Sequence, residues 1–253
     1  MKKYGNSRCF STAIMKYIVI LMGLFSFFNT QAQIERVEPP FWWEGMQYAE
    51  VQVLLYGKNI AQYRVESDLP ITNVLKTENP NYLFVTIDTK GKKAGNYSLS
   101  LLQKNKKVAN VAYELKHRRE GSALRKGFDS SDVIYLLMSD RFANGNPNNN
   151  SHSALTDKLN REASDGRHGG DIQGIIDHLD YIQSVGATAI WHTPLCEDNE
   201  PQHSYHTYAQ TDVYKIDPRY GTNEEYIQLS KALHKRGMKL IKDYVTNHWG
   251  SQH

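Results

Sequence analysis

The chain contains the continuous apolar run Val133-Ile134-Tyr135-Leu136-Leu137-Met138. A run without polar alternation is typical of a strand in a parallel sheet, because helices or other strands cover both faces of such a strand. Two further strand-like segments follow, at residues 187–191 and 238–245. The three runs therefore predict three parallel strands in the second half of the chain.

The segments between these strands show helical periodicity. Apolar residues recur every three or four positions over 172–185 and again over 223–236, and Gly237 follows the second segment as a helix stop signal. Alternating strands and helices build a parallel sheet with right-handed crossovers. A closed (β/α)8 TIM barrel needs eight strands and about 250 residues. We therefore expect residues 121–253 to form an incomplete, N-terminal part of such a barrel.

The first half of the chain has a different pattern. Short runs with period-two alternation, such as 49–56 and 82–87, are separated by turn residues, and the polar segment 116–122 follows them. Runs of this kind, rich in β-branched and aromatic residues, predict an antiparallel immunoglobulin-like β-sandwich of about seven strands. We assign residues 33–120 to this domain.

Residues 1–32 have the layout of a secretory signal peptide. Lys16 precedes the apolar run 18–28, and a segment that includes the small residue Ala32 follows it. The run is shorter than the about 20 apolar residues that a membrane helix needs. We expect cleavage after Ala32 and an exported protein without a membrane span.

The composition narrows the classes of partner. The chain has 253 residues, of which 40% are hydrophobic and 23% are charged, so it can bury a core. The net charge of +3 is too small to indicate a nucleic-acid surface. Two cysteines cannot build a disulfide framework.

Polar sequence follows each predicted barrel strand, at the end where the chemistry of this fold lies. After the first strand, the Asn-rich stretch 140–150 is either a surface turn or a calcium loop, because asparagine and backbone oxygens are calcium ligands. Gly169 and Asp171 offer a further carbonyl and a carboxylate. The residue types alone do not decide between a surface turn and a calcium loop.

After the second strand, His206 and Tyr208 suit a sugar, because a tyrosine ring offers a flat apolar face and histidine offers a donor. A zinc set of His203, His206 and His248 is the weaker alternative, since a His-x-x-His pair in a loop with no nearby carboxylate triad is a weak zinc signal. Asp243 and His248 follow the third strand and fit the same polar pocket, although Asp243 is equally suited to a structural role.

These motifs resemble those of the α-amylase family of glycoside hydrolases, in particular its neopullulanase/cyclomaltodextrinase branch. The resemblance extends from Gln33 onward, and its most specific motifs lie at 140–147, 169–174, 205–212 and 243–248. Members of this branch in Bacteroides-type starch-utilisation systems are periplasmic, and the resemblance implies that location here.

The resemblance implies hydrolysis of α-glucosidic bonds in maltooligosaccharides, cyclodextrins or pullulan with retention of configuration, and a homodimer through the N-terminal domain. It implies that His206, Tyr208 and His248 bind the sugar and that Asp243 is a structural acid at the pocket floor. Asn146 and Asn150 stand where relatives often have Asp, which lowers the charge of the implied Ca2+ site. The implied Ca2+ ligands are Asn144, Asn146, Asn149, Asn150, Gly169 and Asp171.

The family places its catalytic carboxylates after strands four, five and seven, beyond His253. The acidic residues Asp140, Asp171, Glu197 and Asp198 do not occupy those positions. We therefore assign no catalytic residue and expect an inactive fragment of a larger enzyme. Two alternatives stay open: a non-catalytic α-glucan-binding protein that uses Trp42-Trp43, and a glucosyl transferase or isomerase of the same family. Packing of Trp42-Trp43 against the barrel or a partner subunit is the simpler interpretation of those rings.

Overall fold

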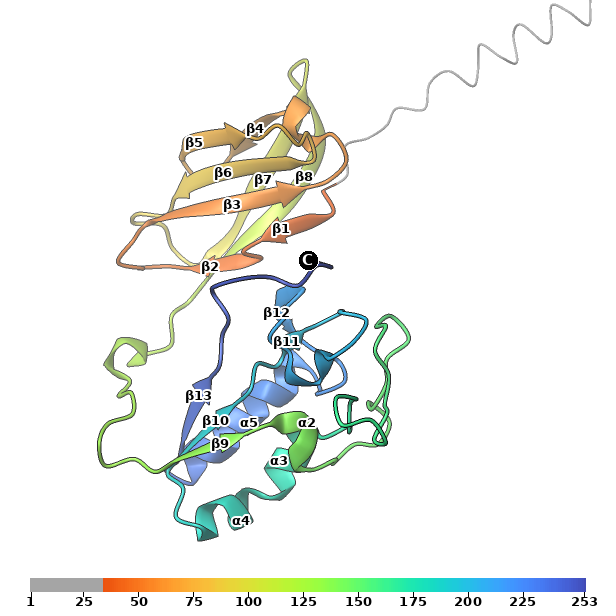
Figure 1. Ribbon diagram of the computed structural model, residues 1–253. Coiled ribbons are helices and arrows are strands. Elements are labelled where there is room, and N and C mark those ends of the chain that lie inside the picture. The colour runs from red at the N-terminus through yellow and green to blue at the C-terminus, as the bar shows by residue number, and fades with distance from the viewer. Residues whose placement is uncertain (1–33) are drawn as a thin grey trace, which may run out of the picture. The chain divides into compact units, whose positions relative to one another are not determined.

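The computed structural model describes residues 34–253, so the predicted signal peptide at 1–32 lies outside the described residues. The chain forms two compact units that divide between Ser122 and Ala123. Figure 1 shows the strands of the first unit and the mixed helices and strands of the second. Each unit is described by itself.

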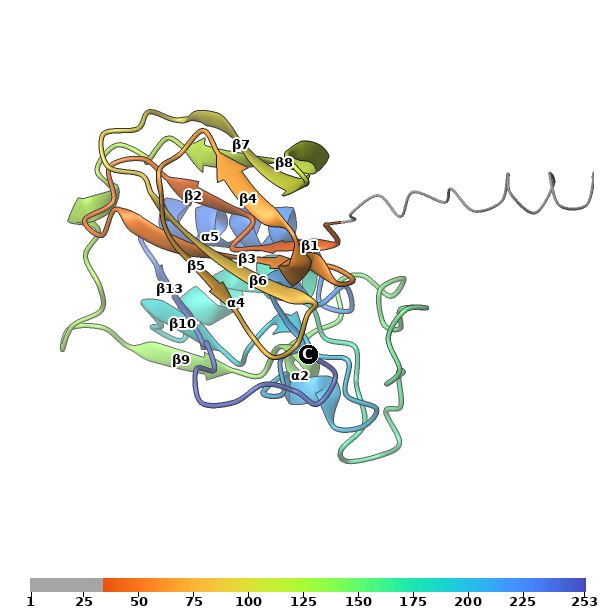
Figure 2. The ribbon, with the colours of Figure 1, turned by 90° about the horizontal axis from the view of Figure 1, so that it is seen from above.

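The first unit is a sandwich of two four-stranded sheets, with strand orders β1-β3-β6-β5 and β2-β8-β7-β4 (Figures 1 and 2). All neighbouring strands are antiparallel except β2 and β8, which are parallel. The strands are β1 Arg36–Glu38, β2 Phe41–Trp43, β3 Glu50–Tyr56, β4 Arg64–Ser67, β5 Ile71–Lys76, β6 Tyr82–Asp88, β7 Gly95–Gln103 and β8 Lys106–Lys116.

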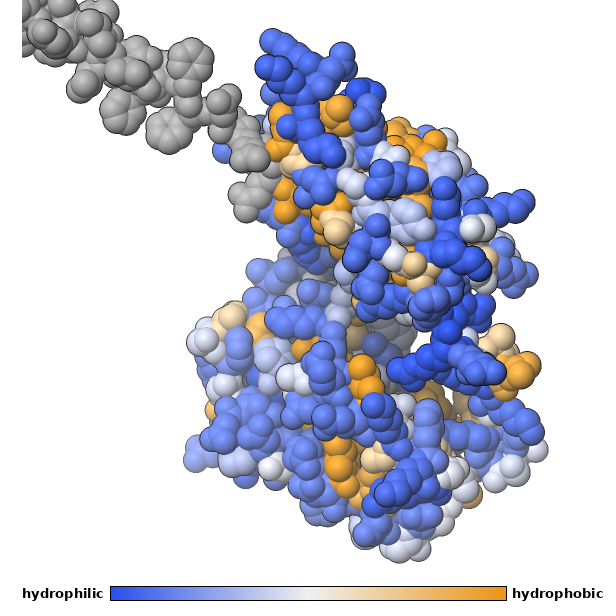
Figure 3. Space-filling view, turned by 180° about the vertical axis from the view of Figure 1, so that it is seen from behind, coloured by the Kyte–Doolittle hydropathy of each residue, from blue (hydrophilic) through white to orange (hydrophobic). Residues whose placement is uncertain are grey.

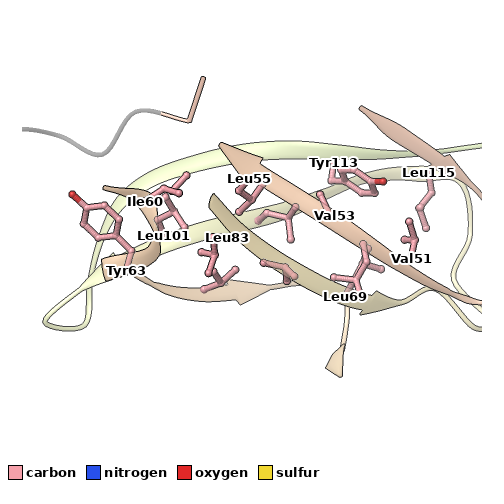
Figure 4. Close-up of a cluster of buried hydrophobic side chains, with 14 residues drawn as sticks. Val51, Val53, Leu55, Ile60, Tyr63, Leu69, Leu83, Leu101, Tyr113 and Leu115 are labelled. Carbon is pink, nitrogen blue, oxygen red and sulfur yellow. The ribbon is translucent and has the colours of Figure 1, made fainter. Parts of the chain in front are cut away.

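The predicted alternation places one set of side chains in the core between the two sheets (Figure 4). In β3, the residues Val51, Val53 and Leu55 are buried, while the alternating Glu50 and Gln52 are exposed. Leu83, Val85 and Ile87 are buried in β6 at the same spacing. Burial of one apolar face of each strand is the main source of the sandwich's stability.

The sandwich differs from its prediction in the number of its strands. It has eight strands rather than about seven, because β1 and β2 contain 3 residues each and are too short to show a period. Trp42 is partly buried and packs against the sandwich's own core. Trp43 is half-buried as well, and the roles considered for the two rings stay predictions.

The second unit contains the three predicted parallel strands, in the sheet order β13-β10-β9. Strands consecutive along the chain are therefore neighbours in the sheet, as in the first strands of a TIM barrel. The elements are β9 Ile134–Leu137, α2 Ser139–Phe142, α3 Ile172–Asp177, α4 Leu179–Ser184, β10 Ala189–His192, β11 Cys196–Glu197, β12 Asp212–Ile216, α5 Asn223–Lys235 and β13 Lys239–Lys242.

The helix predicted over 172–185 is two short helices, α3 and α4, which meet at His178. The backbone of His178 is outside the helical region, with φ −109° and ψ 16°, and its Nδ1 donates to the carbonyl of Gly174 at 2.8 Å. Periodicity cannot reveal such a break, since Ile172, Ile175, Leu179 and Ile182 remain on one buried face.

The second helix, α5, follows its prediction closely. Thr222 and Glu225 form a capping box, in which Thr222 Oγ1 accepts from the Glu225 amide at 3.1 Å and Glu225 Oε2 accepts from the Thr222 amide at 2.7 Å. Gly237 has φ +71°, the left-handed conformation that a helix stop requires. Leu229 and Leu233 bury the inner face of the helix.

The side of the sheet that faces away from the helices is partly exposed among the described residues. Leu137 is 2% exposed, whereas Ile134, Leu136 and Trp191 are exposed by 38%, 64% and 41%. The space-filling view shows apolar side chains among hydrophilic ones on the surface of this unit (Figure 3). An apolar face of this kind, next to unpaired strand edges, favours association. No helix within residues 34–253 has the length and apolar character of a membrane span.

Asp132 links the amino ends of the three barrel strands. Its Oδ1 accepts from Thr188 Oγ1 at 2.8 Å, and its Oδ2 pairs with Lys239 Nζ. These bonds, with that of Lys239 first, lower the pKa of Asp132 to about 2. The charged carboxylate is therefore the form that stabilises the folded chain.

We expect Asp132→Asn to lower the midpoint of urea unfolding at pH 7. The stabilisation is present above the unfolded-state pKa of about 3.9 and is lost as the pH falls toward about 2, so the two proteins should converge there. Asp177→Asn, at an exposed carboxylate of α3 away from Lys239, is the control. A difference that does not shrink at acid pH would contradict the assignment.

Candidate functional site

The loop that follows β9 packs directly on the start of α3. A Cβ on Gly145 would lie 2.4 Å from the backbone nitrogen of Gly174, and a Cβ on Gly174 would lie 2.0 Å from the carbonyl oxygen of Ala143. A Cβ on Gly170 would meet the carbonyl oxygen of Ser139 at 2.1 Å. The contact therefore requires glycine at these positions, because no side chain fits between the two backbones.

Asp171 holds this contact together. It is the N-cap of α3, and its Oδ1 accepts from the amides of Gly174 at 2.6 Å and Gly145 at 3.0 Å. Its Oδ2 accepts from the amide of Asn146 at 2.8 Å, and the residue is fully buried. The sequence analysis missed this role, although an Asp directly before a predicted helix is an N-cap signal.

The predicted calcium ligands gather around the same loop. Asn144 Nδ2 donates to Asn150 Oδ1 at 2.7 Å, and Gly169 approaches Asn150 so closely that a Cβ would lie 2.5 Å from that oxygen. The Oδ1 atoms of Asn144 and Asn149 are buried and have no hydrogen-bond partner within residues 34–253. Buried acceptors without donors are costly, and amide oxygens are ligands that Ca2+ accepts. The set therefore fits a calcium ion.

Besides Asn150, whose Oδ1 accepts from Asn144, two members of the set have other partners. Asn146 Oδ1 accepts from the Asn148 amide at 3.1 Å, and the Asp171 oxygens accept from three backbone amides. Their remaining lone pairs are the ones that a cation would use.

The zinc alternative has no support in the described part of the chain. No group of three or more His, Cys, Asp or Glu side chains there could hold a metal ion. His203 Nδ1 lies instead 3.3 Å from Asp165 Oδ2.

The loop between β11 and β12 brings Tyr208 to Asp243, which follows β13. Tyr208 Oη donates to Asp243 Oδ2 at 3.1 Å, and Trp191 Nε1 donates to the same oxygen at 3.1 Å. The sequence did not indicate Trp191 as a site residue. The strand register does, because Trp191 pairs with Ile241, which shares a face with Asp243. The carboxylate thereby orients two aromatic side chains.

His206 adjoins Tyr208, with ring centroids 5.6 Å apart, and its Nδ1 accepts from the Tyr208 amide at 3.2 Å. That bond assigns the proton of the neutral ring to Nε2, which is left to donate. Burial, together with the charge of His203, lowers the pKa of His206. Burial and the Asp243 charge raise the pKa of Tyr208. Both side chains are therefore uncharged at neutral pH, which suits contact with sugar hydroxyls.

His248 is not joined to this group by a hydrogen bond or ring contact among the described residues. It is exposed, and its Nδ1 lies 3.1 Å from the side-chain nitrogen of Asn247. Its place in the same pocket stays a prediction.

The other carboxylates considered at the strand ends are engaged in loop structure. Asp140 accepts from the amides of His168 at 2.8 Å and Gly169 at 3.1 Å and pairs with Arg141. Glu197 pairs with Lys215 at 2.5 Å. Burial raises the pKa of Asp198 to about 7, and its Oδ1 accepts from the Glu200 amide at 3.0 Å.

Comparison with known proteins agrees with this architecture. Residues 136–253 match the α-amylase catalytic domain, and residues 36–119 match the N-terminal domain of cyclomaltodextrinase. The two matched domains are those of glycoside hydrolases of the α-amylase type, the family that the motifs of this chain resemble. The two matches confirm a β-sandwich followed by the first part of a TIM barrel.

Relatives in the same branch are similar over part of their length. Neopullulanase 2 of Thermoactinomyces vulgaris is 31% identical over 179 residues, which are 70% of this chain and 29% of the relative. Maltogenic α-amylase of Bacillus acidopullulyticus is 37% identical over 118 residues, 47% of this chain and 20% of the relative. The solved structure of an Anoxybacillus α-amylase aligns with a TM-score of 0.44 at 43% identity, over 48% of this chain and 25% of that chain. The chain thus spans less than a third of each.

We expect Asp171→Ala to lower the free energy of unfolding by about 1–3 kcal/mol, because it removes a helix cap and strands buried amides. Asp177→Ala in the same helix, which removes an exposed carboxylate, should change it by less than about 0.5 kcal/mol. Urea unfolding followed by far-UV circular dichroism measures both. Equal losses in the two variants would contradict the role of Asp171.

Proposed function

We propose that this chain is part of an enzyme that hydrolyses α-glucosidic bonds in maltooligosaccharides, cyclodextrins or pullulan with retention of configuration. The observation that carries the proposal is the group of Tyr208, His206 and Asp243 at the carboxyl ends of the barrel strands. Tyr208 is 38% exposed and its hydroxyl is held by Asp243, so the ring is oriented yet accessible. An oriented aromatic ring beside a neutral histidine donor is suited to a glucose ring and its hydroxyls.

The described residues supply binding and orientation. Retaining hydrolysis uses a carboxylate nucleophile and a general acid about 5–5.5 Å apart. The family resemblance assigns both to later barrel strands. In the proposed site, Asp243 fixes Tyr208 and Trp191, while His206 Nε2 donates to a hydroxyl of the bound sugar.

In the complete protein, Tyr208→Ala should lower kcat/KM for maltooligosaccharides at least about tenfold, because stacking and burial of an aromatic ring exceed about 1.4 kcal/mol. Tyr208→Phe keeps the ring and should lose less. Tyr181→Ala, at a 54% exposed tyrosine of α4, is the control. An unchanged rate for Tyr208→Ala would remove this residue from the sugar site.

A calcium ion at the loop after β9 is a second part of the proposal. The ion would take the buried Oδ1 atoms of Asn144 and Asn149, with Asn150, the Gly169 carbonyl, Asn146 and Asp171 completing the set. Its contribution would be structural, since it joins the loop to the start of α3. Its affinity should be modest, because Asp171 is the single carboxylate among these residues.

We expect Ca2+ to raise the unfolding temperature of the chain and EDTA to reverse the effect. Asn149→Ala should abolish the shift, whereas Asn148→Ala at the exposed neighbouring position should keep it. Differential scanning fluorimetry across a calcium titration measures both. A shift that survives Asn149→Ala would place the ion elsewhere.

We also propose that the protein is exported to the periplasm and forms a homodimer through its N-terminal domain. The signal-like sequence of residues 1–32 supports export, and the family resemblance supports the dimer. A mature N-terminus after Ala32, determined by mass spectrometry of the periplasmic fraction, is the expected result.

A further inference from the structure

The residues proposed to contact sugar lie on or beside a single turn, the 3-10 turn Ser204–His206. The residues that flank this turn, His203 and Thr207, have φ of +61° and +55°. The left-handed region is unfavourable for side chains other than glycine, and most of all for a β-branched residue such as Thr207. The turn therefore depends on tertiary contacts to keep its conformation.

Ser204 is held at three of its atoms by residues from another loop. Arg167 Nη1 donates to the Ser204 carbonyl at 2.9 Å and to Ser204 Oγ at 3.1 Å. Asp157 Oδ2 accepts from the Ser204 amide at 3.2 Å and from Ser204 Oγ at 2.9 Å. The hydroxyl thus accepts from a cation and donates to an anion. Hydrogen bonds to charged groups are the stronger ones, and Ser204 and Arg167 are fully buried.

Tyr205, the next residue of the turn, is held in a similar way. The Arg141 guanidinium lies 4.2 Å from the centre of its ring, and the hydroxyl of the buried Tyr220 donates to its carbonyl. Arg167 also lies over the Tyr220 ring, 4.8 Å from its centre. A buried arginine is costly, and Nε and Nη2 of Arg167 have no partner within residues 34–253. Within residues 34–253, the hydrogen bonds of the Arg167 guanidinium therefore go to Ser204.

We propose that Arg167 and Asp157 are positioning residues that fix the turn Ser204–His206 and thereby present His206 and Tyr208 to the sugar. The contact of His206 and Tyr208 with sugar rests on the proposed function, whereas the fixing of the turn does not. The proposal assigns a role to loop 151–167, from which the sequence analysis took no functional residue.

The first test is hydrogen exchange of the full chain with and without Arg167→Met. Amides of the peptide covering 203–208 should exchange about tenfold to a hundredfold faster in the variant, because a buried hydrogen bond to a charged group is lost. Peptides from the sandwich and from α5 should be unchanged. Arg161→Met, at an exposed arginine of the same loop whose Nε donates to the His168 carbonyl, should leave the turn unchanged.

Two variants with smaller changes keep the proposal testable if Arg167→Met misfolds. Ser204→Ala removes only the hydroxyl, and should increase exchange in the same peptide by a smaller factor. Arg167→Lys keeps a buried donor for Ser204, and should recover part of the protection. Exchange that is unchanged in both Arg167→Met and Ser204→Ala would overturn the proposal. A general loss of protection throughout the second unit would also overturn it, because that result describes a structural residue.

The second test is binding of maltoheptaose to the full chain by calorimetry. Arg167→Met should weaken binding about tenfold, and Arg167→Lys should recover part of the affinity. Faster exchange of the turn with unchanged affinity would overturn the positioning role. If the unsubstituted chain does not bind maltoheptaose, the proposed sugar site is wrong, and so is the proposal that the turn presents His206 and Tyr208 to a sugar. The hydrogen-exchange result still decides whether Arg167 fixes the turn.

Discussion

The contact on which the second unit depends is the approach of the loop after β9 to the first turn of α3. Backbone meets backbone there, because Gly145, Gly170 and Gly174 carry no side chain. The Asp171 carboxylate joins the two segments through three amides and caps the helix with one of them. The asparagines of the loop gather at this junction, so the proposed calcium site is a consequence of how the loop is held.

The proposed sugar-binding group depends on a second buried polar network. Asp217 and Arg219 form a fully buried ion pair, with Nη2 2.6 Å from Oδ2 and Nε 2.9 Å from Oδ1. Burial alone would raise the pKa of Asp217, but the hydrogen bond and charge of Arg219 lower it. Arg219 also donates to the carbonyls of Asp157 at 2.8 Å and Asp198 at 2.5 Å. The pair therefore connects loop 151–167 to the loop that carries Tyr208, and a buried pair of this geometry is costly to break.

Much of this arrangement could be predicted from the sequence, and the failures have identifiable causes. Apolar runs identified β9, β10 and β13, and helical spacing with a stop at Gly237 identified α5, because these signals are local. The break at His178 was invisible, since the apolar face continues through it. The residue types of Tyr208, His206 and Asp243 indicated sugar binding, whereas Trp191, Arg167 and Asp157 gave no local signal.

The sequence by itself determined the two-part architecture, the family and the residue types of the site, because periodicity and motif spacing are properties of the chain. Tertiary structure alone decided which oxygens are left unpartnered, that the Asp171 carboxylate also binds the amides of Gly145 and Asn146, and that Trp42 packs against the sandwich core. It also decided that Ser204 lies between Arg167 and Asp157, 37 and 47 positions away along the chain. Partners so distant in sequence meet only after the strands have set their register, and no local pattern records that meeting.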